Sequence, residues 1–331
     1  MREIDRSLTE LESRIRKSHM AQPEADALFE RIVQERVPAG QRSRSPWKSP
    51  FRVSILAVAV AVIGGALIIG PDLLQRPPVD PAVAATPKLL KVHMVVGKNT
   101  TAEKSLESIA RKVEKLQEPN GAESGPFIQE TWSLTTRIGG MQITSAVVPE
   151  RRETWKMADG STKWSVKAEK PQFQNDEQRS LWERQWDAID EPVDRSGTGD
   201  VGYGDAPKNP AEMEAWLHQG APADTAGFIS ESVVDKLMTN HLNPEQRAAL
   251  LRVLATKKGL VTAGEVTDRA GRQGAAYTIK DGSGSIPAEH MIIVDPVNGK
   301  ILAYEEIFLS SSPAMKVEGP AVVNYVTFLK G

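Results

Sequence analysis

FRVSILAVAVAVIGGALIIGPD, residues 51–72, decides how the rest of the chain is arranged. From Val53 to Gly70 the only strongly polar side chain is Ser54, and none of the residues is charged. A helix of this length rises about 27 Å, which is close to the hydrocarbon thickness of a bilayer. A buried helix in a globular protein normally keeps a polar face, and this stretch has none. It therefore predicts a single transmembrane helix over residues 51–70, in contact with the lipid bilayer from Val53 to Gly70.

The position of the apolar run argues against a cleaved signal peptide. About fifty residues precede it, whereas the apolar region of a signal peptide begins within roughly the first two dozen. Basic residues stand just before the run with no acid between them, at Arg42, Arg44, Lys48 and Arg52. Positive residues beside a span stay in the cytoplasm. We therefore expect a single-pass protein of the cell membrane, with a cytoplasmic N-terminus and an extracytoplasmic C-terminal domain.

These features divide the chain into four predicted parts. They are a cytoplasmic helical segment over residues 1–50, the transmembrane helix over 51–70, a proline-rich linker over 71–87 and an extracytoplasmic α+β domain over 88–331. The net charge of −2 gives no signal for nucleic-acid binding. The absence of cysteine excludes disulfides, thiolate metal sites and cysteine nucleophiles.

Two short amphipathic helices are predicted in the cytoplasmic segment. In the second, Leu28, Phe29 and Ile32 lie on one apolar stripe that follows Pro23, a favourable first-turn residue. Helices this short bury their stripes poorly by themselves. Leu28, Phe29 and Ile32 are therefore candidate partner-binding residues, for a cytoplasmic sigma factor or another protein. There are three alternatives. The stripes pack on each other, they pack on a second copy of the chain, or the segment is a partly helical tail in which they do not pack.

The outer domain shows alternating strand and helix patterns. The expected helices cover residues 102–118, 176–190, 210–218, 223–240 and 244–257. The expected strands cover residues 127–136, 140–148, 151–158, 162–168, 260–267, 274–281, 290–294, 301–309 and 321–329. Strands in consecutive runs with tight turns favour antiparallel pairing. We expect an α+β fold in which a mainly antiparallel, curved sheet packs against helices.

Asp159-Gly160 is a strong signal for a two-residue hairpin turn. Such a turn places Trp155 directly opposite Trp164 on one buried face of the sheet, a face that Trp132 can share. An aromatic cluster of this kind is usually core, and it can also line an apolar cleft for a lipid or a peptide. Trp132, Trp155 and Trp164 are therefore candidate ligand-binding residues.

Catalytic patterns are weak. The pattern G-x-G-x-x-G over residues 197–202 lacks the strand before it and the helix after it that a dinucleotide site needs, so residues 191–210 are expected to form a surface loop. The histidines form no H-x-x-x-H or H-E-x-x-H pattern. We expect no enzyme activity, no cofactor and no metal. In residues 268–274, an Asp268–Arg272 pair that braces the loop is favoured over an anion site made by Arg269 and Arg272.

Three stretches carry a resemblance to a known group of proteins. They are LNPEQRAALLRVLATKKGLVTAGEVTDRAGRQGAAYT at 242–278, IIVDPVNGKILAYE at 292–305 and ETWKMADGS at 153–161. Together with the basic N-terminus that precedes the span, they resemble an actinobacterial family of largely uncharacterised single-pass membrane proteins. Genes of that family often neighbour extracytoplasmic-function sigma factors, which implies an anti-sigma-like role in envelope signalling. The resemblance implies no catalytic residues, and the zinc-type anti-sigma pattern of one histidine and two cysteines is missing here.

Three functions follow as hypotheses. The first is a membrane-anchored signalling regulator, in which residues 1–50 contact a cytoplasmic partner and the outer domain senses or binds a ligand. The second is an envelope module that binds lipid or peptide without a cytoplasmic signalling role. The third, an extracytoplasmic enzyme, requires a cleft with converging acids and a histidine.

The predicted topology is testable by reporter fusions. A reporter that is active only outside the cytoplasm is expected to be active when fused after Gly331 and silent when fused after Gln41, because the basic flank holds the N-terminus inside. Reporter activity in bacterial cells measures this directly, and the reverse pattern would contradict the predicted orientation.

Overall fold

The computed structural model describes residues 85–93, 100–117, 125–139, 142–157, 159, 161–185, 194–199, 204–219, 226–282 and 286–330. The predicted cytoplasmic segment and transmembrane helix lie outside these residues. Within the described residues, no helix is long and apolar enough to cross a membrane.

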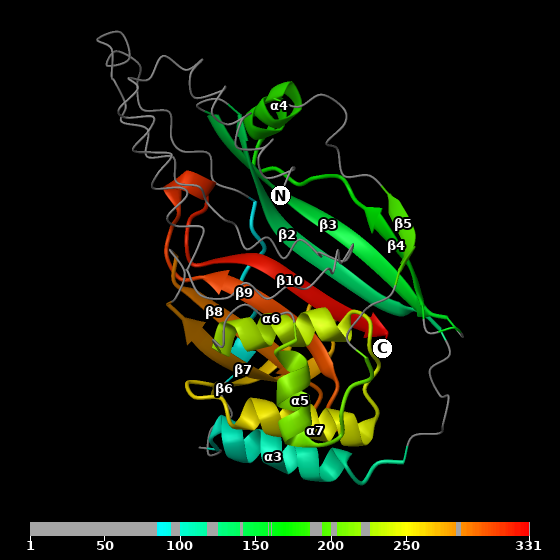
Figure 1. The fold of residues 1–331 in the computed structure, drawn as a ribbon. Helices are drawn as coiled ribbons and strands as arrows, with labels where there is room; N and C mark the ends of the chain where they lie inside the picture. The colour runs from blue at the N-terminus through cyan, green and yellow to red at the C-terminus, as the bar shows by residue number, and fades with distance from the viewer. Residues whose placement is uncertain are drawn as a thin grey trace, which may run out of the picture. The chain divides into compact units, whose positions relative to one another are not determined.

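Ten strands of the described residues form one sheet in which each neighbouring pair is antiparallel. The strands are β1 (Val92–His93), β2 (Phe127–Gly139), β3 (Gln142–Lys156), β4 (Thr162–Ala168), β5 (Arg195–Gly199), β6 (Val261–Thr267), β7 (Gln273–Asp281), β8 (Ala288–Val294), β9 (Ile301–Phe308) and β10 (Ala321–Lys330). Their order is β1-β6-β7-β8-β9-β10-β2-β3-β4-β5. Apart from the short edge strand β1, which pairs with β6, the sheet therefore consists of two meanders, β2–β5 and β6–β10, joined by the pairing of β10 with β2 (Figure 1).

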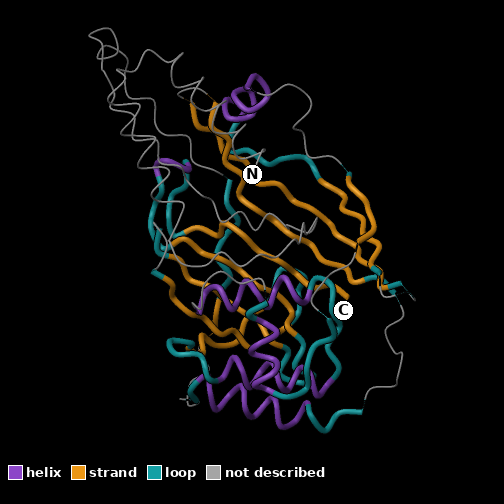
Figure 2. The backbone as a smooth tube through the Cα atoms, viewed as in Figure 1, coloured by secondary structure: helices purple, strands orange, loops and turns teal. Residues whose placement is uncertain are grey.

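The described helices are α3 (Ala102–Val113), α4 (Asp176–Gln185), α5 (Pro210–Leu217), α6 (Ala226–Leu237) and α7 (Pro244–Ala255), with one 3-10 turn, η3 (Pro313–Met315). Helices α3, α5, α6 and α7 are grouped together, whereas α4 lies apart from them and contacts β3 (Figures 1 and 2). The predicted α+β class with a large antiparallel sheet is thus confirmed.

Each face of the sheet has its own apolar cluster. On one face, Tyr277, Tyr304 and Val326 pack in a single core with the buried residues of α3, α5, α6 and α7, so we call it the helix face. On the other, Val266 and Ile293 belong to a smaller core, against which Leu90 and Val92 pack. We call this second side the linker face, because the segment 85–93 begins within the last residues of the predicted linker.

Helix boundaries follow local signals in the sequence. Helix α7 begins at the predicted capping box, with Pro244 in the first turn. The Asn243 side chain accepts a hydrogen bond from the Gln246 backbone N–H, and the Gln246 side chain accepts one from the Asn243 backbone N–H. The turn between β8 and β9 is also as predicted, with Gly299 at a φ of +69°. One predicted break was wrong, because β3 continues through Pro149 where two separate strands were expected.

The β3–β4 hairpin differs from the predicted one by one residue. Thr154 pairs with Trp164, and Trp155 pairs with Lys163. The strands close at Met157 and Ser161, whose backbone groups bond at 2.8 Å, so the loop has one more residue than a two-residue turn. The Asp159 carboxylate accepts hydrogen bonds from the Ser161 N–H and hydroxyl, which stabilises this longer turn.

The shift overturns the prediction about the tryptophans, since a slip of one residue moves a side chain to the other face. Trp132 and Trp155 lie on the linker face, and Trp164 lies on the helix face. The predicted shared aromatic face of Trp132, Trp155 and Trp164 was therefore wrong.

The expected loop over residues 191–210 contains a strand. Strand β5 pairs with β4, and Gly197 lies opposite Trp164. A Cβ atom at Gly197 would come within 2.8 Å of the Trp164 ring, so this glycine makes room for an indole. The G-x-G-x-x-G pattern thus begins within a strand, and its first glycine has a packing reason.

Replacing Leu106 by alanine tests the helix-side core. Leu106 is fully buried on α3, in the same cluster as Leu251 of α7, so Leu106→Ala is expected to lower the free energy of unfolding by about 2–5 kcal/mol. Leu116→Ala, at a leucine that is 40% exposed just beyond α3, is the matched control and should cost less than about 1 kcal/mol. Denaturant unfolding of both variants measures the difference, and equal losses would contradict the assigned packing.

Candidate functional site

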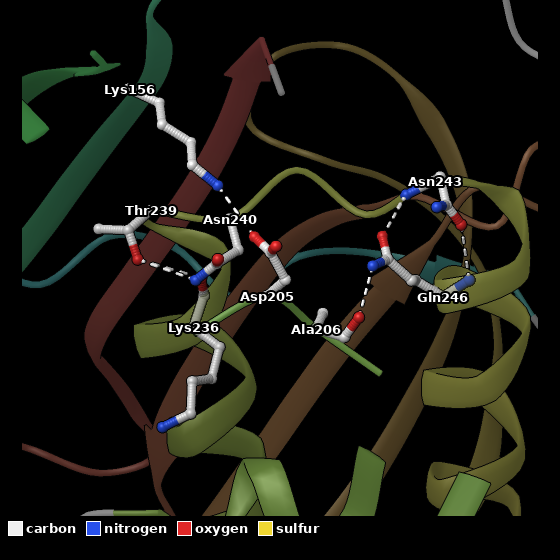
Figure 3. A network of polar contacts seen from close by, with 8 residues as sticks. All are labelled: Lys156, Asp205, Ala206, Lys236, Thr239, Asn240, Asn243 and Gln246. Carbon is white, nitrogen blue, oxygen red and sulfur yellow. Dashed lines mark hydrogen bonds and ion pairs between the residues drawn. The ribbon is translucent and has the colours of Figure 1, made fainter. Parts of the chain in front are cut away.

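The connector between α6 and α7, residues 238–243, is fixed at both ends by side-chain hydrogen bonds (Figure 3). At the end of α6, Asn240 Nδ2 donates to the Lys236 carbonyl at 3.0 Å and to Thr239 Oγ1 at 3.1 Å. These bonds satisfy carbonyl groups that a helix leaves open at its C-terminus. At the start of α7, Gln246 closes the capping box with Asn243, and its Nε2 donates to the Ala206 carbonyl. The connector therefore holds a defined conformation above two cavities.

The first cavity has a volume of about 320 Å³ and lies among the connector, α7 and the ends of β9 and β10. Much of its wall is apolar, and the residues that form this part are Leu237, Leu242, Leu250, Ile301, Leu302, Phe328 and Leu329. Ligand cavities in proteins commonly have about 300–1,000 Å³, so this one lies at the lower end of that range.

Most polar side chains around the first cavity bond to the protein itself. Arg247, only 3% exposed, donates from Nε to the Asn298 carbonyl at 2.9 Å and from Nη1 to the Leu242 carbonyl at 2.7 Å. The Asp295 carboxylate accepts from the Val297 N–H and from Asn298 Nδ2. Since these groups already have protein partners, the cavity offers an incoming molecule mainly apolar contact.

The second cavity, of about 330 Å³, adjoins the first at Asn240 and His241, which line both. Its lining is more polar and includes Lys156 and Asp205, whose exposed ion pair measures 3.0 Å. The His241 ring packs on Phe127 with 3.7 Å between centroids, and Phe127 belongs to this lining. The two cavities together offer an apolar compartment beside a polar one.

Sequence reasoning proposed two sets of residues, of which the structure describes only the tryptophans. Leu28, Phe29 and Ile32 lie outside the described residues. Trp132 packs on Tyr325, with ring centroids 5.5 Å apart, while Trp155 lies beneath the Lys163 ammonium and Trp164 beside the Arg152 guanidinium. None of the three tryptophans lines either cavity.

Sequence reasoning missed the cavity residues, although one signal was available. Arg247 occupies a position on the apolar stripe of α7 that also carries Leu250, Leu251 and Leu254. A charged residue among buried periodic positions needs partners inside the fold, and this requirement marks Arg247 as unusual. No comparable signal marks His241, whose position depends on contacts with β2.

A second buried polar cluster lies beneath α6. His290 Nδ1 and the Tyr304 hydroxyl are 2.7 Å apart, and both side chains are buried. A Cβ atom on Gly227 of α6 would come within 2.5 Å of His290 Nε2 and 2.6 Å of Asp281 Oδ2, so glycine is required for this approach. Burial lowers the pKa of His290 below 6.5, and the nearby Asp281 charge opposes this shift. The neutral imidazole is thus the form that packs under α6.

The described residues contain no group of three or more His, Cys, Asp or Glu placed to hold a metal ion. Comparisons of the chain with protein-family models, curated proteins and solved structures find no match. The case for a function therefore comes from the cavities, the connector and the sequence patterns.

His290 makes the stability of the fold sensitive to acid. Its pKa is lowered in the folded state, so below about pH 6.5 the unfolded chain binds a proton that the folded protein resists, and the free energy of unfolding falls. His290→Gln is expected to reduce this fall between about pH 6.5 and pH 5, although it loses some stability at pH 7. His93→Gln, at an exposed histidine, is the control. Denaturant unfolding across this range measures both, and an unchanged slope in His290→Gln would contradict the assignment.

Proposed function

We propose that the protein is a membrane-anchored regulator of the cell envelope whose outer domain binds the apolar part of a small amphiphile. The acyl chain occupies the first cavity, and the polar end of the molecule lies at the second cavity. The cytoplasmic residues 1–50 contact a partner protein and pass on the state of the outer domain. The role is one of binding and signalling, without catalysis.

The observation that carries the proposal is the wall of the first cavity. Apolar side chains from α6, the connector, α7, β9 and β10 converge there, while Arg247 and Asp295 are held by protein groups. Burial of apolar surface from the ligand contributes about 25 cal/mol per Å², and no polar group of the ligand has to be desolvated against this wall.

A lipid-like ligand is favoured over a peptide by size and by location. The cavity of about 320 Å³ is near the lower end of the range for ligand sites, and a peptide segment would extend beyond it. The predicted anchor at residues 51–70 holds the outer domain close to the membrane, the main source of acyl chains. Lipid binding without any signalling role is the second candidate, and the same cavity supports it.

The signalling half of the proposal rests on the N-terminal segment. The sequence predicts that Leu28, Phe29 and Ile32 lie on one apolar stripe of the kind that binds in a partner groove. The family resemblance favours a sigma factor as this partner. Co-purification with residues 1–50 as bait tests this half, and the absence of any captured protein would leave lipid binding alone as the function.

Photocrosslinking tests the ligand site. In the full chain reconstituted in lipid nanodiscs, a diazirine-bearing fatty acid is expected to form adducts within residues 237–250 and 301–329, as mapped by mass spectrometry. Leu242→Trp fills the cavity and should reduce these adducts about tenfold, which corresponds to a loss of about 1.4 kcal/mol of binding free energy. Leu116→Trp, at a leucine outside the cavity, is the matched control. Adducts spread evenly over the domain, or equal labelling of both variants, would contradict the site.

A further inference from the structure

The loop over residues 268–272, between β6 and β7, is held as one rigid unit by Asp268. The Asp268 N–H donates to the Arg272 carbonyl at 2.9 Å, and Asp268 Oδ1 accepts from the N–H groups of Ala270 and Arg272. Asp268 Oδ2 accepts from Arg272 Nε at 2.8 Å and from Nη2 at 2.6 Å. Gly271 has a φ of +81°, a backbone conformation that residues with a side chain rarely adopt. The predicted Asp268–Arg272 brace is confirmed, and the loop is expected to move as a body.

One side of this loop contacts the first cavity. Arg272 lines the cavity, and its guanidinium donates to the Phe328 carbonyl at 2.6 Å and to the Leu302 carbonyl at 2.8 Å. Leu302 and Phe328 are themselves part of the cavity wall. A ligand that packs against these two residues therefore contacts the same backbone segments that hold Arg272.

The other side of the loop holds the segment 85–93. Arg269 Nη2 donates to the Lys88 carbonyl at 3.1 Å, while its Nε donates to Glu305 Oε1 at 2.6 Å and its guanidinium lies over the Tyr325 ring at 4.7 Å. Glu305 is only 1% exposed, and burial raises its pKa while Arg269 opposes that rise. Arg269 is thus fixed by a buried carboxylate and an aromatic ring, and it presents one donor to the segment.

Further contacts dock this segment on the linker face. Strand β1 pairs with β6 through Val92 and His93, and Leu90 and Val92 pack against the apolar cluster there. Residues 85–93 are the described residues nearest in sequence to the predicted transmembrane helix. Whatever changes their docking changes how the outer domain is joined to the membrane anchor.

We infer that the loop 268–272 couples ligand occupancy of the first cavity to docking of the segment 85–93 on the linker face. The inference rests on the proposed function, since it assigns a consequence to the same cavity. A bound acyl chain supports the backbone at Leu302 and Phe328, which holds Arg272, and through the rigid loop it holds Arg269 against Lys88. Occupancy favours the docked segment, and docking in turn raises ligand affinity by the same factor.

Trypsin provides the readout. The side chains of Lys88 and Lys91 are exposed, but a protease has to bind several residues on both sides of the cleaved bond, so the docked segment is expected to be cut mainly after it leaves the sheet. The full chain in nanodiscs is digested briefly with and without palmitate, and new N-termini at Leu89 and Val92 are quantified by mass spectrometry. Palmitate is expected to slow this cleavage at least about fivefold, within the usual range of allosteric coupling. No change in cleavage, with the diazirine fatty acid still crosslinked in the cavity, would overturn the coupling.

The variant that breaks the coupling is Arg269→Met combined with Glu305→Gln, which removes the ion pair without leaving a buried charge alone. Trypsin should cleave this variant faster than the wild type at Lys88 and Lys91, and palmitate should no longer slow the cleavage. Photocrosslinking in the cavity should persist. Arg151→Met is the matched control, since Arg151 pairs with Glu130 and Glu153 and makes no bond to residues 85–93. It should keep the palmitate response.

The outcomes separate this inference from the proposed function. Loss of photocrosslinking in the wild type overturns ligand binding in the cavity, and the coupling fails with it. Crosslinking together with a palmitate response that survives in the double variant overturns the coupling alone. A thermal melt of the double variant checks that it remains folded. If it does not, the test is repeated with Arg269→Lys, which keeps a charge for Glu305 but has fewer donors for the Lys88 carbonyl.

Discussion

The pairing of β10 with β2 is the interaction on which the rest of the structure depends. The two meanders are separated in sequence by α5, α6 and α7, and within the described residues this pairing is what joins them into one sheet. Without it, each meander would expose an open strand edge, which proteins normally protect. The same pairing places Gln129 beside Phe328, and Gln129 Nε2 donates to the Met238 carbonyl at 3.1 Å. The pairing of β10 with β2 thus positions the end of α6 and the connector that lines both cavities.

Buried and partly buried charged groups connect parts of the chain that are far apart in sequence. Arg247 ties α7 to the β8–β9 turn, and Arg272 ties the β6–β7 loop to β9 and β10. Lys236, fully buried on α6, donates to the Gln219 carbonyl at 2.8 Å and lies over the Trp216 ring, and burial lowers its pKa to about 8. A buried charge is costly without partners, so Arg247 and Lys236 allow few alternative arrangements of the segments that they connect.

The cavity and the linker face lie on either side of one short loop, and this arrangement gives the proposed function a physical basis. A binding site in a membrane-anchored sensor is useful only when its occupancy changes something that the anchor can transmit. Arg272 and Arg269 are three residues apart, yet one contacts the cavity wall and the other contacts the segment 85–93. A ligand shifts an equilibrium only as far as it binds the two states with different affinity, so the proposed response requires tighter binding of the ligand when the segment 85–93 is docked.

The sequence by itself determined the class of the fold, most element positions and the local signals at their ends. The capping box at Asn243, the turn at Gly299 and the Asp268–Arg272 brace were all readable, because each depends on residues within a few positions of one another. Only the tertiary structure decided the register at Asp159, the strand at Gly197 and the cavity around His241. One additional loop residue shifts the register and places Trp155 and Trp164 on opposite faces of the sheet. The Asp159 side chain stabilises this longer turn. The cavity forms where α6, α7, β9 and β10 converge, and contacts between such distant segments leave no periodic trace in a single sequence.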